Sequence, residues 1–199
     1  MNKIEISLTD FVDFVIKSGS PKLTHVKHIK KRPEYHPTYD FYKIVREGIQ
    51  QYHQDGNSKS QLDDILQNVN DQRKIPKYSK IIKGYKKFIG KKKISYFAPP
   101  FDHWRIGNLD VRINPEIGLN IDGNTHIIKL YFKAEDLSKN RITQILALMN
   151  EVFKKNGNYK FSIIDIRKSK LHTYEDNNND LIPLLKGEAN SFETIWLNI

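Results

Sequence analysis

The chain has 199 residues, of which 38% are hydrophobic and 28% are charged, and its formal net charge is +10. This length fits one domain of ordinary size or two small ones, and 10 Tyr, 10 Phe and 2 Trp supply enough bulk for a core. The absence of cysteine excludes disulfides, thiolate zinc sites, iron–sulfur clusters and cysteine nucleophiles, and it fits a reducing compartment. No apolar run reaches the ~18 residues of a membrane helix, so we expect a cytoplasmic protein with no membrane partner.

The first half of the chain shows helical periodicity. Ser7 stands three residues before Asp10 and ahead of an apolar run, a capping pattern that predicts a helix ending before Gly19. Helices are also expected over 21–31 and 38–53, in a short segment that Ser60 caps, and over 77–89. The last of these has an apolar stripe on one side and lysines on the other, so it can pack on a core and still present a basic ridge.

The second half changes to alternating periodicity, which is typical of strands. The predicted elements are strands over 101–106, 109–121 and 126–133, a helix over 137–155, strands over 161–166 and 170–174, and a helix over 181–197. Hairpin turns are expected at Gly107-Asn108 and at Asp122-Gly123, and Asn114-Pro115 interrupts the run between them.

This order of elements predicts an α+β fold. It consists of an N-terminal helical unit, an antiparallel three-stranded meander, a helix, one or two further strands and a C-terminal helix. We expect a boundary near residue 95, which divides the chain into a basic helical unit (1–95) and an α+β unit (96–199). The alternative is one integrated domain.

The positive charge is concentrated in the first half. Residues 1–95 hold 20 Lys and Arg against 10 Asp and Glu, whereas residues 96–199 hold 13 of each. The segment from Arg73 to Lys93 has 10 basic residues and no acidic one. Such a field attracts polyanions, of which nucleic acid is the commonest. The alternative is a solvated lysine-rich surface that keeps the protein soluble.

The expected nucleic-acid contacts lie on the basic helix and at the end of the strand over 161–166. DNA or RNA is the expected partner, with no preference between them. The residues are Lys77, Lys80, Lys83, Lys87, Lys91, Arg167 and Lys168.

Most familiar catalytic motifs are absent. The chain has no glycine-rich phosphate loop, no HExxH pattern and no G-x-S-x-G elbow. His25 and His28 have helical spacing, but the lysines around them would repel a cation. His103, beside Trp104, is either catalytic or a packed or solvent-facing histidine.

One set of polar residues predicts a phosphodiesterase site. Asp110 lies on a strand just before Glu116, and Lys129 lies on the next strand. Carboxylates hold Mg²⁺, and a lysine orients water or stabilises the developing charge. The pattern therefore predicts Asp110, Glu116 and Lys129 as catalytic residues, with Mg²⁺ on the two carboxylates. The alternative is an ordinary sheet with one wet face.

The element order over about 77–166 resembles the core of the PD-(D/E)XK nuclease superfamily. That resemblance implies an acidic residue on the second strand, matched by Asp110 or Glu116, and an acidic-x-Lys tripeptide on the third, matched at Lys129. Ile127 stands where the family has its second carboxylate, so Glu135 or Asp165 would have to replace it. The resemblance implies a Mg²⁺-dependent nuclease or a degenerate nuclease-like module, in bacterial defence.

Three hypotheses follow for the function. The first is a bacterial nucleic-acid-binding protein, and the second is a Mg²⁺-dependent nuclease. The third is a non-catalytic interaction module, an inhibitor or adaptor, that binds an acidic protein partner; the isoleucine at position 127 favours it.

Overall fold

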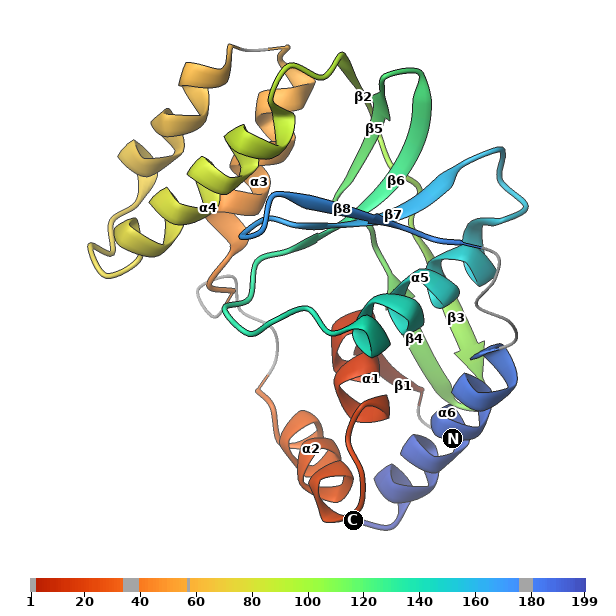
Figure 1. Cartoon of the computed structure of the whole chain (residues 1–199). Coiled ribbons are helices and arrows are strands. Elements are labelled where there is room, and N and C mark those ends of the chain that lie inside the picture. Colours follow the sequence, from red (N-terminus) through yellow and green to blue (C-terminus); the bar gives the residue numbers. More distant parts are fainter. Residues whose placement is uncertain (1–2, 34–39, 57, 176–180) are drawn as a thin grey trace.

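The computed structural model describes residues 3–33, 40–56, 58–175 and 181–199 and has the expected α+β class (Figure 1). The helices are α1 (Leu8–Val15), α2 (Ser20–Lys30), α3 (Lys43–Gln54), the 3₁₀ helix η2 (Lys59–Asn68), α4 (Ile75–Ile89), α5 (Lys139–Phe153) and α6 (Leu181–Leu197). The strands are β1 (Ile4–Ser7), β2 (Ile94–Phe97), β3 (Asp102–Ile106), β4 (Leu109–Ile113), β5 (Ile117–Ile121), β6 (Asn124–Tyr131), β7 (Lys160–Asp165) and β8 (Lys170–Thr173).

The strands form two mixed sheets. The small sheet has the order β1-β4-β3, and the large sheet has the order β2-β5-β6-β7-β8. The pairs β1–β4 and β6–β7 are parallel, and the others are antiparallel. The expected meander is thus two hairpins in two sheets, β3–β4 and β5–β6. Pro115 separates them, because proline has no N–H for a sheet ladder and fixes its own φ angle.

Two short strands, β1 and β2, were not predicted from the sequence. The first half was expected to be helical, but it contains β1 and, at its end, β2. Ile4 and Ile6 of β1 are buried, and the strand pairs with β4 about a hundred residues further along the chain. A four-residue alternation is too short to predict a strand, and its partner is too distant in sequence to be inferred from a turn.

The expected helix signals are mostly confirmed. The N–H of Asp10 donates to the Ser7 side chain at the start of α1, and α2 begins with Pro21 in its first turn. The short helix is a 3₁₀ helix capped by Ser58 and Gln61, so the expected cap at Ser60 is wrong. α3 begins at Lys43, and the expected start at 38 lies outside the described residues.

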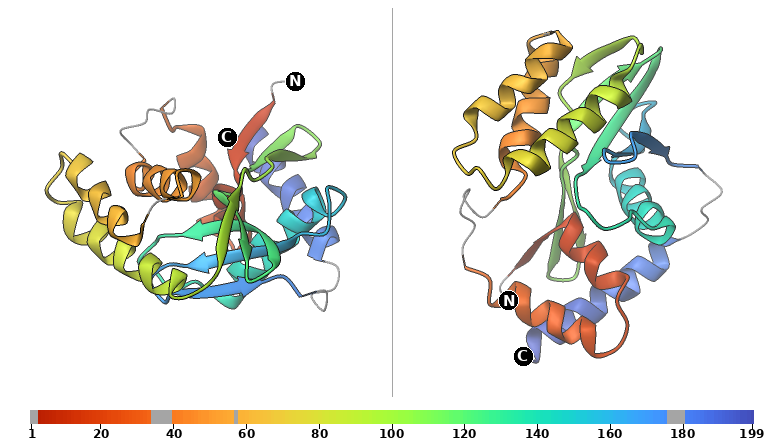
Figure 2. Two further views of the ribbon diagram at one scale, coloured as in Figure 1. Left: turned by 90° about the horizontal axis from the view of Figure 1, so that it is seen from above. Right: turned by 60° about the vertical axis from the view of Figure 1, so that its left-hand side comes forward.

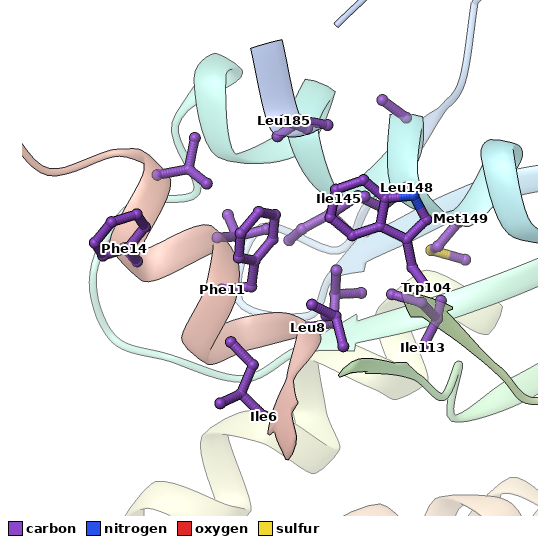
Figure 3. Packing of buried hydrophobic residues seen from close by; sticks show 14 of the residues in the cluster. Ile6, Leu8, Phe11, Phe14, Trp104, Ile113, Ile145, Leu148, Met149 and Leu185 are labelled. Carbon is purple, nitrogen blue, oxygen red and sulfur yellow. The ribbon is translucent and has the colours of Figure 1, made fainter. Parts of the chain in front are cut away.

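The first hydrophobic cluster joins the small sheet to α1, α2, α5 and α6 (Figure 3). The rings of Phe11 and Trp104 lie 5.5 Å apart, and those of Phe14 and Phe192 lie 5.1 Å apart. Elements from the two ends of the chain therefore share one core. Burial of such rings supplies much of the stabilising free energy of a small domain.

The second hydrophobic cluster joins α3, η2 and α4 to the other side of the large sheet. Ile128 and Leu130 of β6 belong to it, whereas Ile127 and Tyr131 belong to the first cluster. The two alternating sets of β6 thus face opposite ways as expected, and helices cover both sides of the large sheet (Figure 2). Each cluster contains residues from both sides of the expected boundary at residue 95, and the division into two units stays a prediction.

A glycine allows α4 to pack closely against the turn between β7 and β8. A Cβ atom at Gly84 would overlap the carbonyl oxygen of Ile166, so only glycine allows this approach. The hydroxyl of Ser169 in the same turn donates to the carbonyl oxygen of Gly84 at 2.9 Å. The basic helix and the β7–β8 turn are therefore fixed side by side.

We predict that Gly84→Ala lowers the free energy of unfolding by about 1–3 kcal/mol, because the added methyl group forces the backbone of the turn away from α4. Urea denaturation followed by circular dichroism measures the change. The control is Gly187→Ala in α6, where a Cβ atom meets nothing within 4 Å. That variant should gain up to about 1 kcal/mol from the higher helix propensity of alanine. Equal stability of Gly84→Ala and wild type would contradict the close contact.

Candidate nucleic-acid interface and polar cleft

The small sheet has one apolar and one polar side, because its strands alternate in register. Ile4, Val111 and Trp104 are among the side chains that face the helices. The polar sheet face comprises Lys3, Glu5 and Ser7 of the β1 segment, Asp110 and Arg112 of β4, and His103 and Arg105 of β3. Its middle is Asp110, which pairs in register with Glu5 on one side and Arg105 on the other.

Asp110 is a buried carboxylate surrounded by cationic groups. Its side chain is only 1% exposed. The Lys3 ammonium group and the Arg105 guanidinium group lie 2.8 and 2.9 Å from its Oδ2 atom, and His103 Nδ1 contacts its Oδ1 atom. Burial raises the pKa of Asp110, but the hydrogen bonds from Lys3, His103 and Arg105 outweigh burial and hold the pKa below its usual range. Asp110 therefore stays ionised and orients these three side chains.

The polar sheet face opens into a cleft of about 1030 Å³. Its walls include Asp10 of α1 and Arg32, which lies just after α2. They also include Arg46 and Gln50 of α3. Most of these charges are paired across the cleft wall. Arg32 binds Asp10 at 2.9 Å, and Arg46 binds Asp40 at 2.7 Å.

The three expected catalytic residues all line this cleft. Glu116 is 8% exposed, and Lys129 contacts its Oε1 atom. The Leu130 N–H donates to Oε2 of Glu116 at 2.7 Å, and Gln50 donates to its carbonyl oxygen at 2.6 Å. The cleft thus brings Asp110, Glu116 and Lys129 together. Their assignment as catalytic residues stays a prediction.

Of the neighbouring polar residues, some line the cleft and others do not. Arg112 and Asn114 line the cleft as well. Tyr131 is buried, and Lys133 forms an ion pair with Asp13 at 3.0 Å, so these two are not among the residues that line the cleft. On this side of β6, Ile127 and Tyr131 are buried in the first hydrophobic cluster together with residues of α5, so the alternative of a wet sheet face does not hold for this strand.

The carboxylates do not fit a Mg²⁺ ion as they are placed here. Both oxygens of Asp110 and both oxygens of Glu116 already accept from nitrogen donors. Mg²⁺ needs about six oxygen ligands in octahedral geometry, and adjacent ammonium groups oppose its charge. Among the described residues, no group of three or more His, Asp and Glu is placed to hold a metal ion.

The expected substitutes for the missing carboxylate lie elsewhere. Ile127 is fully buried. Glu135 is bound to Arg141 at 2.9 Å, and Asp165 accepts from the N–H of Lys168 at 3.2 Å. Neither acid lines the cleft. Metal binding by Asp110 and Glu116 would therefore require them to give up their present partners.

The expected nucleic-acid contacts are all exposed and occur on two adjoining elements. We call Lys77, Lys80, Lys83, Lys87, Lys91, Arg167 and Lys168 the lysine face. The five lysines of the α4 segment recur every three or four residues, which places them along one side of the helix. Arg167 and Lys168 lie in the turn that Gly84 holds against α4.

The lysine face is largely free of opposing charge. Within the described residues, the face forms a single ion pair, between Lys168 and Asp136 at 2.8 Å. The side chains of this pair are 54% and 86% exposed, so the pair is weak. Lys77 lies 5.1 Å above the ring of Phe41, a contact that leaves its charge in place.

Sequence reasoning missed the groups that hold Asp110. Lys3 reaches it through the unexpected strand β1. His103 and Arg105 face it across the β3–β4 hairpin, and their role follows from the register that the Gly107-Asn108 turn sets. The hairpin contacts were therefore within reach of the sequence, whereas the Lys3 contact was not.

No protein-family model matches the chain, and no curated protein matches it. Among the residues that the structure describes, no helix is long and apolar enough to cross a membrane.

We predict that Asp110→Asn lowers the free energy of unfolding by about 2 kcal/mol at neutral pH, because it removes the charge that three donors share. Since the folded-state pKa of Asp110 is depressed, its contribution is present above the unfolded-state pKa and is lost as the pH falls through the folded-state pKa. The difference between variant and wild type should therefore shrink below about pH 4.

Thermal and urea denaturation from pH 3 to pH 8 measure this difference. Asp136→Asn is the control. Among the described residues, Asp136 pairs only with the exposed Lys168, so the midpoint of this variant should not change. A difference between Asp110→Asn and wild type that stays constant down to pH 3 would contradict the assigned charge state.

Proposed function

We propose that this protein binds nucleic acid through the lysine face. One observation carries the proposal: α4 and the β7–β8 turn, fixed together at Gly84, present seven exposed basic side chains with a single weak ion pair among them. Cations that serve the fold are normally paired or spread over the surface. A cluster of unpaired cations on a rigid element is instead the electrostatic footprint of a polyanion site.

The dimensions of the face suit a phosphate backbone. From Lys77 to Lys87 the helix axis rises about 15 Å, over which one strand of B-form DNA presents about four phosphates. Lysine ammonium groups contact phosphates as point charges and read no base edges. The proposed binding is accordingly independent of sequence and open to DNA and RNA.

We also propose that the cleft is a nuclease-like site in degenerate form. Its three expected residues lie together, but nitrogen donors occupy the carboxylates, and Ile127 occupies the position of the second acid. Binding should then need no divalent metal. The Mg²⁺-dependent nuclease remains the competing proposal, since Asp110, Glu116 and Lys129 do line one cleft.

We predict that the triple variant K80E/K83E/K87E loses at least 100-fold in affinity for nucleic acid, because it reverses three of the seven charges that face the phosphates. The measurement is fluorescence anisotropy of labelled duplex DNA and single-stranded RNA at 50 and 150 mM salt. Wild-type affinity should fall steeply between these two conditions, since each neutralised phosphate releases counterions.

The matched control is K139E/K155E/K186E, which reverses three exposed lysines outside the lysine face and changes the net charge equally. It should bind within a few-fold of wild type. Unchanged binding by K80E/K83E/K87E would show that another surface binds. No binding by wild type at 50 mM salt would overturn the proposal and leave an acidic protein partner, which pull-down experiments would test.

We predict that EDTA leaves the binding affinity unchanged and that incubation with Mg²⁺ yields no cleavage, because the carboxylates of the cleft are already occupied. Denaturing gels of labelled DNA and RNA provide the readout. Cleavage that depends on Mg²⁺ and disappears in Lys129→Ala would establish the nuclease instead of the degenerate site.

A further inference from the structure

An exposed aromatic ring stands beside the polar sheet face. Phe101 immediately precedes β3 and is 66% exposed, the highest value among the large hydrophobic side chains of the described residues. Its ring lies 5.9 Å from that of His103 in an edge-on arrangement. An exposed ring does not gain the free energy that burial would give, so its exposure does not serve the stability of the fold. Exposed apolar surface of this kind often marks a binding site.

Basic side chains lie on the same face of the sheet as this ring. Phe101 precedes His103 and Arg105 at alternate positions, which places the three on the same side of the strand. Arg112 pairs in register with His103 and is exposed. No ion pair or hydrogen bond engages the Arg112 side chain within the part of the chain that the structure describes, although it lines the cleft.

The anionic groups nearby leave these cations available. Asp110 is buried beneath Arg105 and Lys3, and Glu5 is paired with Lys3 at 2.8 Å. Asp110 holds Arg105 by its Nε atom, so the outer nitrogens of that guanidinium group remain for another acceptor. The sheet face that Phe101 adjoins therefore carries two exposed guanidinium groups, those of Arg105 and Arg112.

An exposed aromatic ring beside a sheet face that carries arginines is an arrangement suited to unpaired nucleotides. A base stacks on the ring, and guanidinium groups contact the flanking phosphates. Duplex nucleic acid cannot use the ring, because its bases are already stacked on one another. An acidic peptide would use the arginines but has no need of a flat stacking surface.

We propose that the polar sheet face, with Phe101 as the stacking residue and Arg112 as a phosphate contact, binds single-stranded nucleic acid. This site is separate in sequence from the lysine face, and it specifies the class of nucleic acid that the polar sheet face takes. It rests on the proposed function only in that nucleic acid is the ligand.

Fluorescein-labelled (dT)12 and a 12-base-pair DNA duplex serve as probes in anisotropy titrations of the full chain. Phe101→Ala should lower the affinity for (dT)12 about fivefold or more and change duplex affinity less than twofold, since one stacked base contributes about 1–3 kcal/mol. Arg112→Gln should weaken (dT)12 binding and reduce the slope of log K against log salt by about 0.7, the loss of one single-strand phosphate contact.

The controls remove comparable groups elsewhere. Leu184→Ala truncates a side chain of α6 that is 54% exposed, and Lys155→Gln removes an exposed charge outside both surfaces. Both should bind (dT)12 as wild type does. Thermal melting of Phe101→Ala should match wild type, because the exposed ring contributes little packing.

Photo-crosslinking locates the contact directly. (dT)12 with a single 5-iodouracil should crosslink to the tryptic peptide spanning 94–105, which contains Phe101, and the yield should fall in Phe101→Ala. Unchanged (dT)12 affinity in both Phe101→Ala and Arg112→Gln, together with a loss in K80E/K83E/K87E, would overturn this site and leave the lysine face intact. Duplex binding without (dT)12 binding would do the same, and a wild-type protein that binds neither probe would overturn both proposals.

Discussion

The bend at Asn114-Pro115 is the constraint on which the arrangement of this molecule depends. It falls between β4 and β5 and directs the two strands into different sheets. The sheet ladder resumes immediately, since the N–H of Glu116 donates to Ile128 at 3.0 Å. One stretch of chain thereby carries Asp110 on one sheet and Glu116 on the other, and the cleft lies where the two sheets diverge.

The charged side chains of the molecule fall into two groups. Those of the cleft are mostly ion-paired, whereas those of the lysine face mostly are not. In the cleft, most acids and bases are matched, as in Arg32–Asp10, Arg46–Asp40 and Lys129–Glu116. Such partly buried pairs fix geometry, because removing one partner strands the other. On the lysine face the cations have almost no acidic neighbours, so their field extends into solvent. A polyanion would therefore be attracted by unpaired cations at the lysine face, whereas in the cleft it would face side chains that ion pairs already hold in place.

The sequence encodes the local parts of this architecture and leaves the non-local parts open. The caps at Ser7 and Pro21, the two hairpin turns and the lysine spacing of α4 depend on residues close together in the chain, and each was predictable. Parallel pairing of β1 with β4 joins segments a hundred residues apart, and no turn sets its register. For that reason the Lys3 contact with Asp110, and with it the charge state of the expected site, could not be read from the sequence.

The position of Ile127 shows that replacing it with a carboxylate would not by itself complete a metal site. Ile127 is fully buried and pairs in register with Phe161 of β7, beneath α5. A carboxylate there would lose its hydration without gaining a nitrogen donor, which costs several kcal/mol or forces the group to stay protonated. Lys129, two residues on, instead neutralises Glu116. The packing of β6 and the ion pair at its cleft end thus support each other, and both disfavour a cation held by the acids of the cleft.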